Sequence, residues 1–333
     1  MPLVSVVIAA YKSRPDYLST AIRSALDQTC SDLEILVSDD SPDDALGKVV
    51  EGCADARVRY RWNRTPLGAA RNHWASFLEA RGEYVAVLNH DDRFAPTFLE
   101  RLVAPLQSHE ELVLAFCDHW VIDEDGRILT EQTEKNSARW GRSRLTEGTH
   151  RPFFDLLIAQ AVPMAAGAVF RRERLPAALP ALAGPAYDLW MAYLLCREGL
   201  GAYYVRDRLC SWRAHSENLT SRGGFDWRLG AAECWATVAA DPALVSVRGP
   251  ARERAAFALS SCAAAAWRSG RRRECLSFGL RSFRMRPTWR GAFACLLPLL
   301  PKERVPRGAK PATGAGGDPE PPDEARAGSG SGR

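Results

Sequence analysis

The chain has 333 residues, of which 46% are hydrophobic and 25% are charged, so it can bury one large core with an accessory segment beside it. Its 44 basic and 40 acidic residues give a formal charge of +4, and this near balance argues against a nucleic-acid binder, which would concentrate basic residues on one face. The nine cysteines are scattered without a CxxC pair, which predicts reduced thiols.

Targeting signals are missing from the sequence pattern. The N-terminus enters an apolar run almost at once, with no basic region before it and no small-residue cleavage site after it. The longest apolar stretch, 291–301, is about half of the roughly 20 residues that a membrane-spanning helix needs. We therefore expect a cytoplasmic protein without a transmembrane segment and without a nucleic-acid partner.

Short apolar runs of strand length alternate with helical patterns in the first third of the chain. The helical pattern between the first two runs repeats apolar residues at i, i+3, i+4, i+7 and i+8 from Leu18, and Pro15 suits its first turn. This alternation predicts an α/β fold with a mixed, mainly parallel sheet and helices on both faces. The predicted strands are Val4 to Ala9, Glu34 to Val37, Val58 to Trp62, Tyr84 to Leu88 and Leu112 to Cys117.

The second half of the chain is less regular. Residues 130–165 are polar and aromatic without a clear period, which is long for a loop and indicates a functional or mobile segment. We predict a helix from Tyr187 to Glu198, closed by Gly199, and then two short strands at 203–205 and 209–212. Residues 228–286 have helical spacing and predict a helical appendage, and the composition from 302 onward predicts disorder.

Acidic residues follow the second and fourth predicted strands. Asp39 ends the second strand, and Asp91 and Asp92 follow the fourth. Since ligands of parallel sheets bind at the carboxyl ends of the strands, these acids are candidates for a base-reading carboxylate and for oxygen ligands of Mg²⁺ or Mn²⁺. Taken alone, the same residues are also common in turns and helix caps.

Four motifs in this order and spacing resemble glycosyltransferase family 2. They are Val4-Ser5-Val6-Val7-Ile8 with Tyr11, the segment from Leu33 to Ser41, Gly68-Ala69-Ala70-Arg71-Asn72, and Leu88-Asn89-His90-Asp91-Asp92. The resemblance implies a GT-A fold in which Asp39 reads the nucleotide base, Tyr11 and the backbone at Ala9 line the base pocket, and Arg71 helps to anchor it. It also implies that Asp92 and Asp91 are the metal and diphosphate carboxylates, although Asn89 stands where many relatives have a further Asp.

Two later segments match the family at its catalytic end. Asp188 corresponds to the second acid of the family's Glu-Asp pair and is the candidate general base, while Tyr187 stands in place of the Glu. Read alone, Asp188 also suits the first turn of a helix. Arg213 and His215 resemble the closing aromatic-Arg-x-His signature, which implies a diphosphate clamp and a third metal ligand. A lone histidine such as His215 is otherwise more often a surface or core residue.

The resemblance gives the chain an expected division and function. We expect a catalytic domain over 1–222, with a nucleotide-sugar half at 1–118 and an acceptor and base half at 119–222, followed by the appendage at 223–301 and a tail at 302–333. Residues 130–165 would form an acceptor-side flap. The enzyme would move a sugar from a donor of the UDP type to an unidentified acceptor with inversion. We expect it to transfer a single sugar, because the Gln-x-x-Arg-Trp motif of processive members is missing.

Two other functions stay open from the sequence. A nucleotidyltransferase also uses a sheet, a metal and a nucleotide, but it would need a glycine-rich phosphate loop, and residues 9–16 contain no glycine. A catalytically silent nucleotide-sugar binding module would keep the fold without the chemistry.

The basic segment from Arg268 to Arg290 suggests one more partner. Trp267, Trp289 and the arginines around them, followed by Leu296 to Leu300, are typical of a patch that contacts anionic lipid at a membrane surface. Ordinary helix packing is the alternative.

Overall fold

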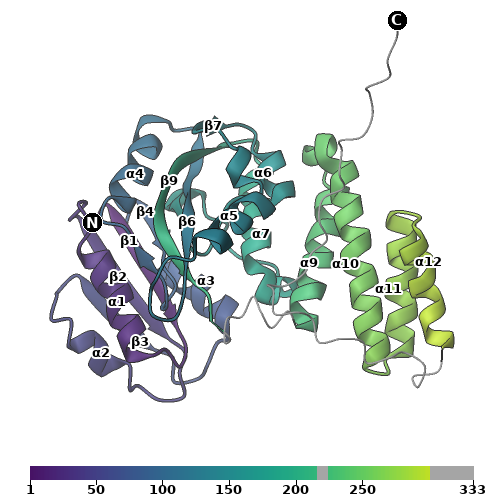
Figure 1. Cartoon of the computed structure of the whole chain (residues 1–333), viewed down its shortest axis with the longest axis horizontal. Coiled ribbons are helices and arrows are strands. Elements are labelled where there is room, and N and C mark those ends of the chain that lie inside the picture. Colours follow the sequence, from purple (N-terminus) through teal and green to yellow (C-terminus); the bar gives the residue numbers. More distant parts are fainter. Residues whose placement is uncertain (216–223, 301–333) are drawn as a thin grey trace, which may run out of the picture.

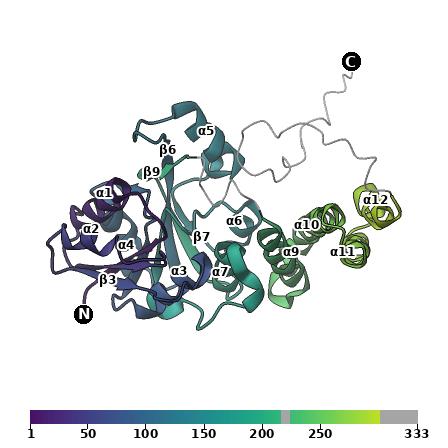
Figure 2. The same ribbon diagram turned by 90° about the horizontal axis from the view of Figure 1, so that it is seen from below.

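Residues 1–215 form a mixed sheet with helices on both faces, and a bundle of helices lies beside it (Figure 1). The structure is a computed structural model that describes residues 1–215 and 224–300. Figure 2 shows the bundle extending away from the sheet to one side. The predicted boundary at 222 and the predicted tail from 302 lie outside the described residues, so the division into domains stays a prediction.

Nine strands of the described part form one sheet in the order β3-β2-β1-β4-β8-β6-β9-β5, with β7 paired to β9. Six strands, β1 to β4, β6 and β9, run in one direction, while β5, β7 and β8 run the opposite way, which confirms the mixed, mainly parallel sheet. The strands are β1 (Val4–Ala10), β2 (Leu33–Asp39), β3 (Val58–Trp62), β4 (Tyr84–Val87), β5 (Arg93–Phe94), β6 (Leu112–Ile122), β7 (Gly148–His150), β8 (Ala168–Arg171) and β9 (Gly201–Arg213).

The helices cover the two faces of the sheet because the inner strands are apolar on both sides. Val6 and Ile8 of β1 pack with α1 and α4 on one face, whereas Val7 packs with α3, α6 and α7 on the other. The helices around the sheet are α1 (Pro15–Leu26), α2 (Gly47–Glu51), α3 (Ala69–Glu79), α4 (Phe98–Ser108), α5 (Thr130–Arg139), α6 (Phe154–Ala159) and α7 (Tyr187–Cys196). The predicted α1 is confirmed, with Pro15 in its first turn.

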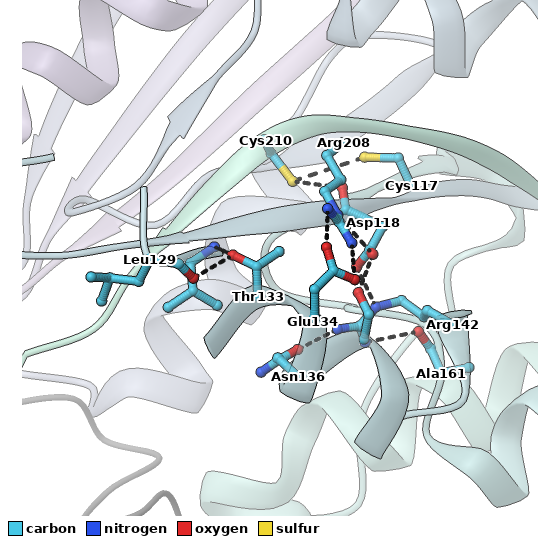
Figure 3. Close-up of polar contacts among 12 residues, drawn as sticks. Cys117, Asp118, Leu129, Thr133, Glu134, Asn136, Arg142, Ala161, Arg208 and Cys210 are labelled. Carbon is cyan, nitrogen blue, oxygen red and sulfur yellow. Dashed lines mark hydrogen bonds and ion pairs between the residues drawn. The ribbon is translucent and has the colours of Figure 1, made fainter. Parts of the chain in front are cut away.

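Residues 130–165 are not one long loop, which corrects the expectation of an aperiodic segment, while their role as an acceptor-side flap stays a prediction. They fold into α5, a turn of 3-10 helix at Arg142–Arg144, β7 and α6. Helix α5 is attached through Asp118 of β6, whose carboxylate accepts the hydroxyl of Ser137 in α5. The same carboxylate accepts hydrogen bonds from Arg142 and Arg208 at 2.7 and 3.2 Å (Figure 3). Although burial favours the neutral acid, the charge of Arg142 lowers the pKa of Asp118.

The two short strands predicted after α7 are one continuous strand. β9 runs from Gly201 to Arg213 and pairs with β6 over its whole length, with register shifts around Asp118. The exposed Arg206 and Asp207 interrupt the apolar pattern without interrupting the strand, because the backbone hydrogen bonds to β6 continue past them.

The helical bundle is attached to α7. It consists of α9 (Phe225–Ala240), α10 (Arg248–Arg268), α11 (Arg272–Met285) and α12 (Trp289–Leu296). The indole Nε1–H of Trp190 in α7 donates to the carbonyl of Gly230 in α9 at 3.0 Å, and Asp241 after α9 accepts hydrogen bonds from Tyr193 and Arg197. None of the helices in the described residues combines the length and the apolar character that crossing a membrane requires.

Candidate active site

The candidate site lies at the carboxyl edge of the parallel strands. Asp39 is the last residue of β2 and pairs with Ala10, the last residue of β1. The Asn89 to Asp92 segment follows β4, which is parallel to β1. Arg213 is the last residue of β9, which points the same way. The sheet therefore gathers these predicted site residues along one edge.

Asp39 is fully buried and held in one orientation. Its Oδ1 accepts the backbone N–H of Ser41 at 2.8 Å, and its Oδ2 accepts the Tyr60 hydroxyl at 2.7 Å. On β1, Ala9 pairs with Ser38, the residue before Asp39, and Tyr11 follows the strand with 52% of its surface exposed. Each carboxylate oxygen can still accept a second hydrogen bond, and contact of this buried carboxylate with a nucleobase stays a prediction.

Asp40 organises the segment that leads to Arg71. Its Oδ1 and Oδ2 accept the backbone N–H groups of Leu67 and Gly68, each at 2.7 Å. Gly68 has a φ of 82°, which favours glycine, and α3 starts at the next residue. Arg71 is exposed in the first turn of this helix, so its guanidinium is available to a ligand. Sequence reasoning assigned no role to Asp40, although its place next to Asp39 in the motif was visible.

Asp92 is buried and serves as a structural acceptor. Its Oδ1 accepts the backbone N–H of Arg213 at 2.8 Å, and its Oδ2 accepts the side-chain amide of Asn89 at 2.7 Å. Burial, and then the neighbouring charge of Asp91, raise the pKa of Asp92 well above its usual value. These bonds hold the end of β9 to the segment after β4, and the role of Asp92 as a metal ligand stays a prediction.

Asp91 and His215 form a hydrogen-bonded pair at this edge of the sheet. His215 Nε2 lies 2.7 Å from Asp91 Oδ2, and each side chain is 15% exposed. Arg213 helps to hold Asp91 in place. Its Nε–H donates to the carbonyl of Asp91 at 2.8 Å, and its Nη1 donates to the carbonyls of Asp123 and Glu124.

Tyr17 of α1 completes that support, and no sequence signal pointed to it. Its ring lies 4.2 Å from the guanidinium carbons of both Arg14 and Arg213, and its hydroxyl donates to the carbonyl of Glu124 at 2.9 Å. These contacts give Arg213 a positioning role. A direct contact of Arg213 with a diphosphate stays a prediction.

The donor set fits a divalent ion that takes its remaining ligands from a substrate. Adjacent ligands of an octahedral Mg²⁺ lie about 3 Å apart, close to the separation of the Asp91 and His215 donor atoms. Over residues 1–215 and 224–300, no cluster of three or more acidic, histidine or cysteine side chains has the geometry to hold a metal. The predicted three-residue set of Asp91, Asp92 and His215 is therefore not preformed.

Asp188 lies in the first turn of α7, where its Oδ1 accepts the backbone N–H of Leu189 at 2.8 Å. Burial raises its pKa above the usual value for a carboxylic acid. No ion pair of Asp188 occurs within the described ranges. A carboxylate in a partly dry position without a cation beside it is a stronger base than an exposed one.

Tyr187, the residue directly before Asp188, contacts helix α3. Tyr187 stacks on His73 of α3, with ring centroids 5.1 Å apart and planes 21° apart. Burial, and then the charge of His90, lower the pKa of His73 to about 4. His90 directly precedes Asp91. Sequence reasoning set His73 aside, and no signal in the sequence predicted its contact with Tyr187.

The fold and this site define the class of the protein. The model of the family described as glycosyl transferase family 2 matches residues 5–173, just over half of the chain. The chain belongs to this family, and the predicted GT-A-like α/β fold is confirmed.

Curated relatives share only part of their length with this chain. Over 133 residues it is 32% identical to an uncharacterized glycosyltransferase of Methanocaldococcus jannaschii, covering 39% of this chain and 46% of the relative. Over 142 residues it is 37% identical to the succinoglycan biosynthesis protein ExoO of Rhizobium meliloti, covering 42% and 39%. A third relative, named UDP-Glc:alpha-D-GlcNAc-diphosphoundecaprenol beta-1,3-glucosyltransferase WfaP, from Escherichia coli, is 29% identical over 121 residues, covering 36% and 47%. The chain thus spans less than half the length of each of these three.

Solved structures resemble this chain in fold. The TarS fragment 1-349 of S. aureus superimposes with a TM-score of 0.58 at 13% identity, covering 89% of this chain and 78% of that fragment. The mannosyltransferase PcManGT of Pyrobaculum calidifontis, in complex with GDP-Man and Mn2+, gives a TM-score of 0.52 at 16% identity, covering 89% and 87%.

Proposed function

We propose that this protein is a glycosyltransferase that moves one sugar from a nucleotide-diphosphate donor to an acceptor nucleophile, with inversion at the anomeric carbon. The observation that carries the proposal is the common edge of the sheet, along which Asp39 and the pair of Asp91 and His215 lie. Asp188 follows Tyr187, which stacks on His73 of α3. Membership of glycosyl transferase family 2 supports transfer of a sugar over transfer of a nucleotide.

The donor base would be recognised at Asp39. A carboxylate held by Ser41 and Tyr60 accepts an imide N–H, which uracil has, while the exposed Tyr11 ring offers a stacking surface. We therefore favour a UDP-type donor. WfaP is named for UDP-Glc, whereas PcManGT was solved with GDP-Man, so a test has to include both bases.

Asp188 would act as the general base. Its carboxylate takes the proton of the acceptor as the acceptor atom attacks the anomeric carbon, and the bond from that carbon to the diphosphate oxygen breaks on the opposite side. The raised pKa of Asp188 strengthens it as a base near neutral pH. Arg71, exposed in α3, would help to anchor the nucleobase of the donor.

Asp91 and His215 would hold a divalent ion, Mg²⁺ or Mn²⁺. When bound, the ion offsets the negative charge on the leaving diphosphate. Asp92 would support the site through Arg213 and Asn89. The chain's own residues supply two ligands, and the diphosphate and water would supply the others.

The experiment is a panel of nucleotide-diphosphate sugars incubated with the purified full chain, with Mg²⁺, Mn²⁺ or a chelator, and assayed for slow release of sugar to water. We expect release from one donor, and loss of that release in the chelator. A silent binding module would bind a donor in calorimetry without releasing its sugar. That result would refute the enzymatic proposal.

The acceptor and the cellular location stay predictions. We expect a cytoplasmic enzyme with an acceptor that only a screen can identify. The predicted contact with a membrane concerns a different surface, formed by α11 and α12.

A further inference from the structure

Helices α11 and α12 each present an exposed row of large apolar side chains. In α11 the row has the spacing i, i+4 and i+7, and in α12 it repeats the same spacing. The six exposed residues, which we call the apolar rows, are Leu276, Leu280 and Phe283 in α11 and Trp289, Phe293 and Leu296 in α12. Trp289 is 81% exposed, and Leu299 just beyond α12 is 78% exposed.

These rows are not needed for packing within the bundle, because each helix already buries another face. Cys275 and Phe278 of α11 and Ala294 of α12 lie in the core of the bundle. The two helices meet at glycines: a Cβ on Gly279 would lie 2.8 Å from the carbonyl carbon of Ala294, and one on Gly291 would lie 3.2 Å from Phe283 Cα. Apolar area is therefore left over on the outside of a well-packed pair.

The same segment is strongly basic. Residues 268–290 contain eight arginines and one acidic residue, Glu274, and residues 275–300 contain no acid at all. Some arginines are engaged within the bundle, such as Arg281, which forms an ion pair with Glu233 at 2.7 Å. Arg272, Arg273 and Arg284 are exposed, and they form no ion pair within the described ranges. A surface that combines exposed aromatic residues with uncompensated arginines suits an anionic interface.

We propose that α11 and α12 dock this protein on an anionic phospholipid bilayer, with the apolar rows in the boundary of the acyl chains and the arginines at the headgroups. A second copy of the chain fits this surface less well. A twofold dimer would place the same patch against itself and bring arginines against arginines. Trp267, which the sequence placed in such a patch, does not take part, because it is buried in the bundle core.

Docking of α11 and α12 on a bilayer would also restrain the helix that carries Asp188. The bundle is attached to α7, the helix that carries Asp188, by the Trp190 bond to Gly230 and by the bonds of Tyr193 to Asp241. A bilayer-bound bundle thus restrains the helix of the candidate site without contacting that site.

The test is co-sedimentation of the full chain with vesicles of phosphatidylcholine alone or of an equal mixture with phosphatidylglycerol. We expect binding to the anionic vesicles only, and weakening by raised salt. Trp289→Ser combined with Phe293→Ser should reduce binding by about tenfold or more. Arg272→Gln, Arg273→Gln and Arg284→Gln together should do the same. Leu78→Ser, which changes an exposed leucine of α3, is the matched control and should bind like the wild type.

The same samples separate the other outcomes. Equal binding to both kinds of vesicle, or none to the anionic kind, would overturn the proposal, and so would a Trp289 and Phe293 variant that binds like the wild type. If the wild type does not bind vesicles but forms a dimer in sedimentation equilibrium, and this variant is a monomer, the docking proposal is overturned. The surface would then bind a second copy of the chain. Sugar release from the donor should be unchanged in the variant, so a failure of docking is distinguishable from a failure of the proposed catalysis.

Discussion

The backbone N–H of Arg213 donates a hydrogen bond of 2.8 Å to Oδ1 of Asp92, although the two residues are 121 positions apart. Through this bond the end of β9 is attached to the segment after β4. Arg213 in turn bonds the carbonyl of Asp91, and His215, two residues further on, meets the Asp91 carboxylate. One buried acid thus assembles the pair that we propose holds the metal ion.

Asp92→Ala should therefore act through position rather than through a lost ligand. The Arg213 N–H and the Asn89 amide would lose their acceptor, so we expect a fall of about 1–3 kcal/mol in the free energy of unfolding. Metal-dependent donor binding should weaken as well, because His215 is no longer held. Denaturant unfolding measures the first effect and calorimetry the second. Asp125→Ala, which removes a surface partner of Arg127, is the control and should change stability by less than about 1 kcal/mol.

Asp188→Asn should abolish transfer while leaving donor binding near the wild-type value. The asparagine amide cannot accept the proton of the acceptor, and loss of a general base lowers the rate by about 10²–10⁴-fold. Asp155→Asn makes the same change in the first turn of the neighbouring helix α6, and its activity should stay normal. Normal turnover of Asp188→Asn would refute its role as the base.

The pH dependence of transfer gives a second view of Asp188. The base acts only when ionised, so the rate should fall as the pH is lowered through its pKa, which burial raises above 3.8. Asp188→Glu should retain some activity and shift the midpoint of this acid limb. A midpoint that does not move in this variant would assign the limb to another group.

His73 should make stability sensitive to mild acid. Its pKa is about 4 in the folded chain and 6.5 ordinarily, because burial disfavours its charged form. Between these values the unfolded chain binds the proton and the folded chain does not, so stability falls as the pH is lowered. The expected loss from His73 between pH 7 and pH 5 is about 2 kcal/mol. Urea unfolding of His73→Gln at both pH values should show a loss smaller by about that amount, and an equal loss would contradict this assignment.

Gly230 should be required where α9 meets the helix that carries Asp188. A Cβ at this position would lie 2.6 Å from the carbonyl oxygen of Ala183, so Gly230→Ala must move the two segments apart. We expect a loss of about 1–3 kcal/mol and a lower transfer rate. Gly249→Ala in α10, where a Cβ meets nothing within 4 Å, should leave both unchanged or slightly increase stability. Thermal melts and the transfer assay check both variants.

Much of the fold could be predicted where burial follows a simple period. The apolar spacing from Leu18 and the proline at 15 predicted α1, and the alternation of strands and helices predicted the sheet. Helix α5 was missed because its buried side chains, Thr133 and Ser137, are polar, so no apolar period marks it. The single strand β9 was divided because exposed charged residues lie in its middle.

Part of the site could be predicted as well. The acids at the ends of β2 and β4 were visible because polar residues directly after buried strands are a local pattern. Tyr17 and Tyr60 were not visible, because their roles depend on contacts with Arg213 and Asp39 across distant elements. The two hydrogen-bond donors of Asp92 were not visible either, because one of them, Arg213, ends a strand 121 positions away.

The most direct test of the central claim is calorimetry of the donor selected by the sugar panel. The account predicts that the wild type binds it in the presence of Mg²⁺ or Mn²⁺, and that Asp39→Asn and Asp91→Asn each weaken binding by about tenfold or more while retaining near-normal melting temperatures. Asp43→Asn, an exposed acid of the same segment, should bind like the wild type. Wild-type affinity in both the Asp39 and the Asp91 variants would contradict the account, because the donor would then bind elsewhere.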